Sequence, residues 1–360
     1  MKIGILTYYG VHNHGAVLQA NALRQVLLNK GHDCGFLEFE RDYSNISEIQ
    51  ANKYKLGIGS IFFYAKYFLE KGIGNIFYNI QKKKTLDQFR KTNLPMIGDY
   101  KKFSGDLIII GSDEVFSLEI GVNPFLYGND LPTKHSFSYA GCFGPTTYED
   151  VIGQKQENMI RKGLQKLEAV SVRDENSLDT VKKIANIDAK LVCDPVILYG
   201  YKKERGTFVP PERDYILVYS YDKNMNNPNE YRYIKEYAKQ HHLKIFSVGY
   251  YHSWCRSINA SPIELLGWVK HATMVVTDTF HGSVLSIICN TPVVVKVRGN
   301  QNKLRFLLSE YGLLERIMTD FDAFKEVADS KIDFEKVNCL IEEKRTKSMQ
   351  FIDNSLKKCL

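Results

Sequence analysis

Short apolar runs rich in β-branched residues alternate along the chain with longer segments of amphipathic, helical character. The chain opens in this way, with an apolar run at 3–7, a helical segment that ends near Gly31 and another apolar run at 34–39. The alternation continues, and further strands are predicted at 106–110, 135–139, 169–172, 215–219, 244–248 and 274–276. Strands separated by helices are typical of parallel sheets covered by helices, so the pattern predicts an α/β fold.

The predicted strands and helices divide into two groups. A segment at 201–213, rich in proline and charged residues, separates them and has the character of an interdomain linker. We predict an N-terminal Rossmann-like domain at 1–200, a second Rossmann-like domain at 214–330 and a C-terminal helix at 331–360. Ligands bind at the carboxyl ends of the strands in doubly wound sheets. The two domains are therefore expected to face each other across a cleft, as in the GT-B architecture.

An aromatic-rich segment at about 55–92 interrupts the first domain. Two helices are predicted there, at 56–69 and 73–80, each followed by lysines. Aromatic side chains beside lysines are typical of helices that lie on a membrane surface. The alternative is that the aromatic side chains cover the first sheet as part of the core, and the composition favours this alternative. Peripheral contact with the inner face of a membrane through 56–84 is a separate prediction.

The composition is that of a globular protein, with 44% hydrophobic and 25% charged residues. The net charge of +7 suits an acidic ligand but is too dispersed for a nucleic-acid partner. The seven cysteines are scattered without a Cys-x-x-Cys pair, so we expect reduced thiols, no disulfide framework and no metal site. The N-terminus lacks a signal-peptide layout and no run of 18 apolar residues occurs, which predicts a cytoplasmic protein.

The candidate chemistry centres on the last strand–turn–helix unit of the second predicted domain. Asp278, Thr279 and His281 fall at the carboxyl end of that strand. Backbone amides at Gly282 and Ser283 begin the helix and favour an anion there. A histidine beside an anion site suggests phosphate or carboxylate chemistry. The alternative is that His281 caps the helix and Gly282 only permits a tight turn.

Polar residues also follow two strands of the first predicted domain. Asn13, Gly15 and Gln19 come after the first strand, and Ser112 and Asp113 come after the strand at 106–110. The first turn holds one glycine and is neither a Gly-x-Gly-x-x-Gly nor a Walker sequence, so the usual dinucleotide and nucleoside-triphosphate sites are not indicated. Asn13 alone is also explained as a helix cap.

An arginine, Arg173, directly follows another strand and precedes a helix. It either pairs with Asp174 or Glu175 at the surface or reaches into the cleft for an anion. Taken alone, the surface pair is the simpler interpretation. Further basic residues follow the last predicted strand, the β-branched run that Pro292 begins: Arg298, Lys303 and Arg305.

Several of these segments, taken in order, resemble the motifs of the polysaccharide pyruvyl transferase family. They are Lys2-Ile-Gly-Ile-Leu-Thr, Asn13-His-Gly-Ala-Val-Leu-Gln19-Ala, Gly111-Ser-Asp-Glu-Val-Phe116, Ser171-Val-Arg173-Asp174, Cys193-Asp194-Pro195 and Val276-Thr-Asp-Thr-Phe-His281-Gly. The resemblance implies transfer of an enolpyruvyl group from phosphoenolpyruvate to a sugar of a cell-surface polysaccharide or its precursor, sometimes lipid-linked. A ketal forms and phosphate is released. Phosphoenolpyruvate is then a co-substrate, and neither a metal nor another cofactor is implied.

The resemblance also implies roles for individual residues. His281 and Asp113 are expected to carry the acid–base chemistry, with Asp113 facing the acceptor sugar. Arg173 is expected to hold the negative charge of the donor. The N-terminal loop residues Asn13, Gly15 and Gln19 match the corresponding loop of the family.

Two departures from the family pattern stand out. Many members carry an arginine where this chain has Thr279, so one phosphate contact is missing unless Arg298, Lys303 or Arg305 supplies it. The chain also reads Glu114-Val-Phe116 where members commonly have glutamine, valine and tryptophan. The second departure concerns the identity of the acceptor more than the reaction.

Two other functions compete with pyruvyl transfer. One is a nucleotide-sugar-dependent glycosyltransferase of GT-B form, although the second domain lacks an obvious acidic residue for the ribose. The other is a protein that binds a sugar or phosphate without catalysis, which only the missing arginine at Thr279 supports.

Overall fold

The computed structural model describes residues 1–40, 60–298 and 301–359, and it confirms the predicted α/β fold with two parallel sheets. The first sheet has seven strands in the order β3-β2-β1-β4-β5-β6-β7, and the second has six in the order β10-β9-β8-β11-β12-β13. The first sheet comprises β1 Lys2–Leu6, β2 Asp33–Glu38, β3 Met96–Asp99, β4 Leu107–Asp113, β5 His135–Gly141, β6 Ser171–Val172 and β7 Lys190–Leu191. The second comprises β8 Tyr215–Tyr219, β9 Lys244–Val248, β10 Arg256–Ile258, β11 Met274–Thr277, β12 Val293–Lys296 and β13 Ile317–Met318.

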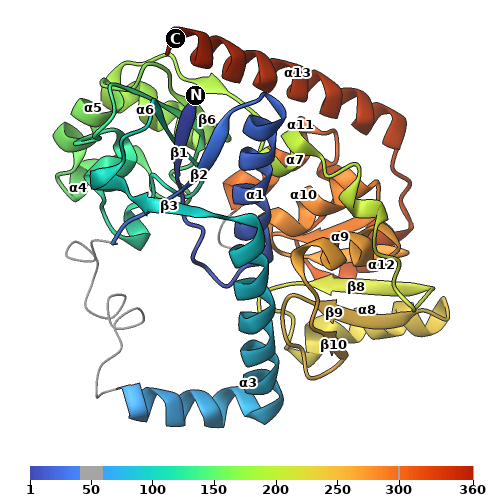
Figure 1. The fold of residues 1–360 in the computed structure, drawn as a ribbon. Helices are drawn as coiled ribbons and strands as arrows, with labels where there is room; N and C mark the ends of the chain where they lie inside the picture. Colours follow the sequence, from blue (N-terminus) through green and yellow to red (C-terminus); the bar gives the residue numbers. More distant parts are fainter. Residues whose placement is uncertain (41–59, 299–300, 360) are drawn as a thin grey trace.

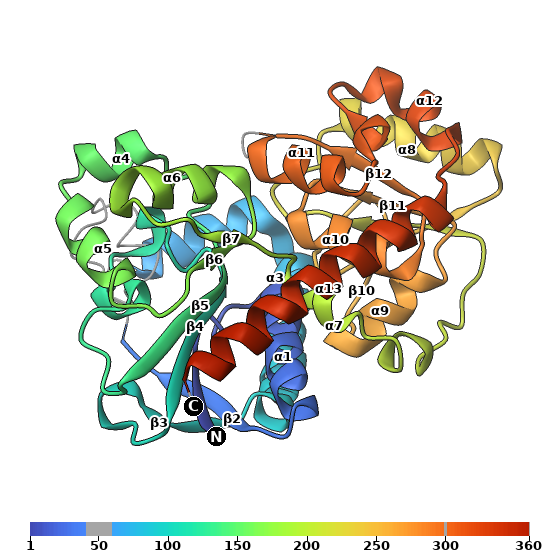
Figure 2. The same ribbon diagram turned by 90° about the horizontal axis from the view of Figure 1, so that it is seen from above.

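Helices surround both sheets, and Figures 1 and 2 show the two sheets as separate, neighbouring bodies. The α-helices are α1 His14–Asn29, α3 Ser60–Asn93, α4 Tyr148–Gly153, α5 Glu157–Leu164, α6 Glu175–Ala185, α7 Pro195–Tyr199, α8 Pro228–Gln240, α9 Pro262–Lys270, α10 Phe280–Cys289, α11 Gln301–Glu310, α12 Phe324–Asp329 and α13 Phe334–Lys358. Short 3-10 helices lie at Tyr100–Lys102, Leu118–Ile120, Pro124–Tyr127, Glu204–Gly206, Leu314–Arg316 and Phe321–Ala323.

The central strands form where the sequence is continuously apolar. All five residues of β8 and all four of β11 are buried, because helices cover both faces of the sheet. The sequence pattern does not predict the edge strands, because these strands are short or partly exposed. For example, β3 has no buried residue. Helices α4 and α5 are separate, because Lys155 between them has a left-handed backbone conformation at φ 57°.

Helix α3 is two helical segments that meet at Gly72, whose φ of 74° is not helical. This agrees with the predicted pair of helices, although residues 56–59 lie outside the described residues. The helix extends beyond the first sheet to the second (Figure 1), where the Tyr78 hydroxyl donates to the Ile258 carbonyl at 3.0 Å. Nearby, the Asn259 amide donates to the Thr85 hydroxyl at 2.8 Å. The helix therefore links the two domains in addition to covering the first.

The C-terminal helix α13 crosses from the second domain back to the first (Figure 2). The Cys193 backbone amide donates to the Ser348 hydroxyl at 2.9 Å, and the Phe351 ring lies 6.1 Å from that of Phe137 in β5. Burial of this aromatic contact holds α13 against the first sheet. Within the described residues, no helix is both long enough and apolar enough to cross a membrane.

A buried histidine joins the domains at the start of α1. The Nε2 atom of His14 lies 2.8 Å from the carbonyl oxygen of Ala260, which precedes α9 in the second domain. His14 is 1% exposed, and burial together with the charge of Lys82 lowers its pKa to about 3. A neutral ring with its proton on Nε2 satisfies the carbonyl, whereas a charged ring at this interface would be poorly solvated.

This burial predicts an acid sensitivity that resides in one side chain. Unfolded histidine takes up a proton below about pH 6.5, whereas folded His14 does so only near pH 3. Its contribution to stability is therefore full above pH 6.5 and is lost as the pH falls. Going from pH 7 to pH 5 should lower the free energy of unfolding by about 2 kcal/mol through this group. Urea unfolding at both pH values should show that part missing in His14→Gln and retained in the exposed control His242→Asn. Equal pH dependence in all three proteins would contradict the assignment.

Candidate active site

A cavity of about 340 Å³ lies between the two domains, where the carboxyl ends of both sheets face each other. Its first-domain wall comes from loops after β1 and β4, from the start of α1 and from the turn after β6. Its second-domain wall comes from residues after β8, β9 and β11 and from α11. The lining residues are Tyr8, Val11, Asn13, Ala16, Asp113, Glu114, Ile120, Arg173, Tyr219, Tyr221, Tyr250, Thr279, Phe280, His281 and Lys303.

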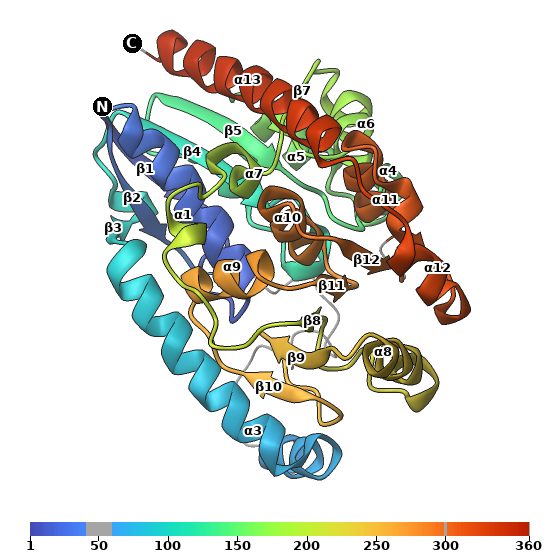
Figure 3. The same cartoon turned by 90° about the vertical axis from the view of Figure 1, so that its right-hand side faces the viewer.

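Helices α1 and α10 meet at their N-termini beside this cavity, and Figure 3 shows the two helices next to each other. The contact is close because residue 15 is glycine: a Cβ atom there would lie 2.2 Å from Cγ of His281. Asn13 is the N-cap of α1 and accepts from the Gly15 amide at 2.8 Å. Thr279 is the N-cap of α10 and accepts from the Gly282 amide at 2.9 Å. His281 is therefore not the helix cap, and its ring is available to the cavity.

The guanidinium of Arg173 lies inside the cleft and does not form the surface pair considered above. Nη1 donates to Asp194 at 2.9 Å and Nη2 to Asp113 at 3.3 Å, and the guanidinium carbon lies 4.5 Å from the centre of the Phe280 ring. Asp174 is engaged elsewhere, as the cap of α6. The side chain of Arg173 is 2% exposed, and its Nε has no hydrogen-bond partner among the described residues. A buried, unpaired N–H is a position that a ligand can satisfy.

The two acid–base candidates, His281 and Asp113, both line this cavity, and they favour different protonation states. Burial lowers the pKa of His281 below 6.5, and Asp194 and Asp113 offset this only in part, so the ring is neutral at pH 7. Its Nε2 lies 3.9 Å from Asp194 and has no hydrogen-bond partner among the described residues. Burial alone would raise the pKa of Asp113, but the charges of Arg173 and Lys303 lower it below its usual value, so this group is a carboxylate. The site thus offers a neutral imidazole and an ionised acid.

Of the three basic residues that follow the last predicted strand, Lys303 alone lines the cavity. Lys303 lies in α11 of the second domain and forms an ion pair with Glu114 of the first domain. This ion pair therefore crosses the cleft. Arg298 is engaged elsewhere: it donates to Glu230 and to Asp278, each at 2.8 Å. Arg305 does not line the cavity either.

The predicted residues Gln19, Ser112 and Asp278 do not line the cavity, but they form hydrogen bonds next to residues that do. Gln19 donates to the Thr7 hydroxyl at 3.2 Å, and Thr7 donates to the Ser112 carbonyl at 2.8 Å, which holds the loop that carries Asp113. Asp278 accepts from Ser220 at 2.8 Å and from Asn224 at 2.6 Å, and it does not line the cavity.

Two small residues of α10, Gly282 and Ser283, contribute to the packing at the start of this helix. A Cβ at Gly282 would lie 2.1 Å from the Thr277 hydroxyl, and the Ser283 hydroxyl donates to the Thr279 carbonyl at 3.3 Å. Neither of these residues lines the cavity.

Sequence reasoning missed the aromatic wall of the cavity. Tyr219 and Tyr221 both lie near Tyr250, with ring centres 5.3 Å apart in each pair, and Tyr8 faces them from the first domain. Tyr219 ends β8, and the other three each lie two residues beyond a strand end. The rule that selected Asp113 and His281 would therefore also have selected these rings.

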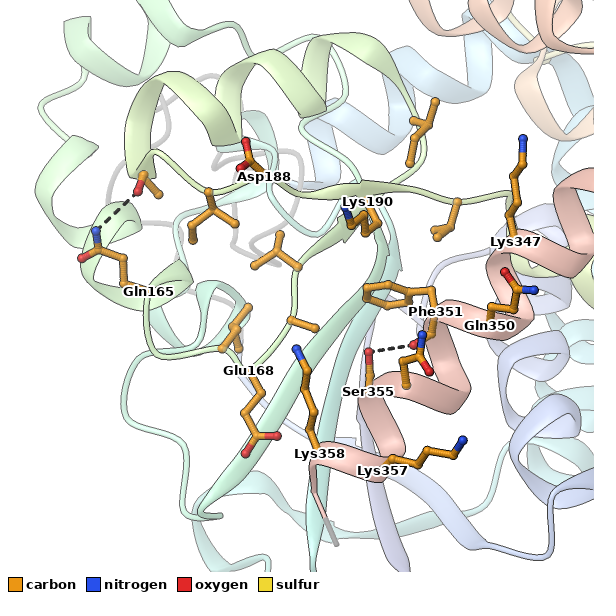
Figure 4. A pocket seen from close by; sticks show the side chains of 18 of the residues that line it. Gln165, Glu168, Asp188, Lys190, Lys347, Gln350, Phe351, Ser355, Lys357 and Lys358 are labelled. Atoms are coloured by element: carbon orange, nitrogen blue, oxygen red, sulfur yellow. Dashed lines mark hydrogen bonds between the residues drawn. The ribbon is translucent and has the colours of Figure 1, made fainter.

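A larger cavity of about 1160 Å³ lies on the far side of the first domain, between β7 and α13. Figure 4 shows Lys190, Lys347, Lys357 and Lys358 around it, with Phe351 among them. Its lysines are exposed, and none of the candidate acid–base residues lies there. The smaller interdomain cavity is the better candidate because it brings together buried charges, an unpaired imidazole and both sheet ends.

The overall fold has counterparts among solved structures of low sequence identity. The glycotransferase of kitacinnamycin aligns with a TM-score of 0.54 at 13% identity, over 100% of this chain and 98% of its own. A putative UDP-N-acetylglucosamine 2-epimerase from Listeria monocytogenes aligns with 0.54 at 8% identity, over 93% and 90%. The glycosyltransferase SnogD from Streptomyces nogalater aligns with 0.50 at 12% identity, over 99% and 99%. The chain therefore has the GT-B fold, as the paired sheets indicated.

The family follows from the sequence itself. The family model for polysaccharide pyruvyl transferase matches residues 13–298, which include the cavity residues from Asn13 to His281. This chain belongs to the polysaccharide pyruvyl transferase family, and the protein is accordingly a transferase. No curated protein sequence matches the chain significantly.

The close approach at Gly15 predicts a specific packing defect. Gly15→Ala places a methyl group against the His281 ring, so α1 and α10 must separate. Overpacking of this kind should lower the free energy of unfolding by about 1–3 kcal/mol. Chemical denaturation measures the loss, and Gly10→Ala is the matched control because a Cβ there meets nothing within 4 Å. Equal stability of the two variants would show that the helices do not meet at this point.

Proposed function

We propose that this protein transfers an enolpyruvyl group from phosphoenolpyruvate to a sugar of a cell-surface polysaccharide or its precursor, forming a ketal and releasing phosphate. The observation that carries the proposal is the convergence of Arg173, Lys303 and His281 in one interdomain cavity of a family member. These residues come from three separate strand ends or helices of a GT-B fold. They combine two cations with a neutral imidazole, which suits a donor that bears both phosphate and carboxylate.

Donor binding is assigned to the two cavity cations. Arg173 offers an unpaired Nε and is held in place by Asp194 and Phe280. Lys303 takes the place of the arginine that many family members carry at the position of Thr279. In the free protein Lys303 pairs with Glu114, so the donor phosphate must displace that carboxylate. The tyrosine wall across the cavity gives flat aromatic faces of the kind on which a sugar ring can pack.

The proton transfers of the proposed reaction balance with two groups. Neutral His281 takes the proton of the first sugar hydroxyl as that oxygen attacks the central carbon of the donor, and it returns the proton to the methylene carbon. Asp113 takes the proton of the second hydroxyl, which displaces the phosphate, and passes that proton to the leaving phosphate. The products are a methyl-bearing ketal and hydrogen phosphate, and no metal enters these steps.

The first experiment is phosphate release from phosphoenolpyruvate with a panel of free and lipid-linked sugars. His281→Asn should reduce the rate by about 100-fold or more, because the proton carrier is lost. The matched control His242→Asn, an exposed histidine, should keep the rate. The acid limb of kcat/KM should lie below pH 6.5, since His281 must be neutral and its pKa is lowered.

If the protein accepts no sugar in the panel, the melting temperature in the presence of phosphoenolpyruvate tests donor binding separately. Phosphoenolpyruvate should raise the melting temperature of the wild-type protein. If it does not, and a nucleoside diphosphate sugar does, the protein is instead a nucleotide-sugar-dependent glycosyltransferase. If turnover survives His281→Asn, the catalytic assignment is wrong.

We further propose that α3 rests on an anionic membrane surface, which would bring lipid-linked acceptors to the cleft. Ile73, Phe77 and Ile80 lie on one helical face and are 59%, 63% and 49% exposed. Lys83 and Lys84 follow and are exposed. Of the predicted basic flank, Lys82 is an exception: it is 5% exposed and lies 4.2 Å from the centre of the Tyr250 ring.

Sedimentation with vesicles tests this contact. At low salt the protein should sediment with vesicles of phosphatidylglycerol and phosphatidylcholine, and less with phosphatidylcholine alone, because the lysines attract anionic headgroups. Phe77→Glu should reduce the bound fraction several-fold. Val209→Glu changes another exposed apolar residue, 53% exposed and outside α3, and should bind as the wild type does. Equal binding by both variants would exclude α3 as the contact.

A further inference from the structure

Three metal-binding side chains that are remote in sequence meet at the end of the C-terminal helix. His135 begins β5, Glu168 precedes β6, and Cys359 directly follows α13. The His135 ring nitrogen, a carboxylate oxygen of Glu168 and the sulfur of Cys359 all lie within 4.8 Å of one another. Nδ1 of His135 bonds to Oε1 of Glu168, and the Cys359 sulfur donates to Oε2 at 2.9 Å. This group lies outside the interdomain cavity and outside the mechanism described above.

The chemical composition of this group favours zinc. Nitrogen, oxygen and sulfur donors together suit a borderline ion such as Zn²⁺, whereas Mg²⁺ and Ca²⁺ prefer oxygen alone. Ligand atoms around a tetrahedral zinc lie roughly 3.3–3.7 Å apart, given bond lengths of about 2.0–2.3 Å. The three ligand atoms here lie within 4.8 Å of one another, which is close to such distances.

The burial of the group fits a metal site with an open position. Cys359 is 6% exposed, while the side chains of His135 and Glu168 are 26% and 24% exposed. The sulfur is thus protected, and the nitrogen and oxygen ligands lie toward solvent. Solvent has access for metal entry, and a water molecule can supply the fourth ligand.

We propose that His135, Glu168 and Cys359 bind Zn²⁺ and that the ion fastens the end of α13 to the first domain. On binding, the thiol proton of Cys359 leaves to solvent and the sulfur bonds to the metal as thiolate. In the metal-free protein Glu168 accepts a hydrogen bond from that thiol, and in the metal-bound protein its carboxylate binds the ion directly. No oxidation or reduction takes place.

The position of α13 gives this site a structural purpose. The same helix carries Ser348, which accepts from the Cys193 amide beside Asp194, and Asp194 holds Arg173. The helix begins in the second domain and ends at Cys359 on the first. A metal at its far end would close a long loop and restrict separation of the domains. The proposal stands independently of the pyruvyl transfer.

Cobalt substitution tests the proposal with a readout other than activity. Metal-free protein titrated with Co²⁺ should develop a thiolate-to-cobalt charge-transfer band that saturates at equimolar metal and is displaced by Zn²⁺. Cys359→Ser should abolish the band while keeping a hydroxyl that can bond to Glu168, so the fold should persist by circular dichroism. Cys339→Ser, an exposed cysteine on the same helix, is the matched control and should retain the band.

A second measurement separates a true site from a hydrogen-bonded network alone. Zn²⁺ should raise the melting temperature of the wild type and of Cys339→Ser, but not of Cys359→Ser. His135→Asn should weaken cobalt binding by at least tenfold. A wild-type protein without the band and without a zinc-dependent rise in melting temperature would overturn the proposal. A band that persists in Cys359→Ser would overturn it too, because the metal would then bind elsewhere.

Discussion

A buried guanidinium is stable only when carboxylates or other acceptors surround it, and Arg173 meets this requirement at the centre of the molecule. Asp113, at the end of β4, and Asp194, after β7, bind it from two sides, while Phe280 of α10 covers its face. The ion pairs therefore fix the relative positions of the strand ends, and the contact with Phe280 ties them to α10 of the second domain. His281 follows Phe280 directly, so its place in the cleft depends on the same contact.

The cleft is shaped by close domain contacts from three directions. Gly15 allows the N-termini of α1 and α10 to meet, α3 bonds to the second domain through Tyr78, and α13 returns across both domains. Such contacts orient the cavity residues before any ligand arrives. Preorganised charges of this kind stabilise a transition state more effectively than groups that must move into place.

Both departures from the family pattern make the site more negative, and Lys303 offsets part of this change. Thr279 stands where many members have an arginine, and Lys303 lines the same cavity from α11. Glu114 stands where a glutamine is common and forms an ion pair with Lys303. A cation has thus been lost at one position and another is present nearby, together with its own counter-ion. This pairing keeps Lys303 charged in a buried site, since the carboxylate raises its pKa despite burial.

The sequence by itself determined the α/β class, most central strands, and the strand ends at which Asp113, Arg173 and His281 lie, because hydrophobic periodicity and turn residues are local properties. Only the tertiary structure decided that Arg173 pairs with Asp194 and Asp113 inside the cleft, that Arg298 is tied to Glu230 while Lys303 reaches the cavity, and that four tyrosines line it. It also assembled His135, Glu168 and Cys359, which no sequence spacing connects. Long-range partners depend on how separate elements pack together, and the local pattern of a chain does not specify that packing.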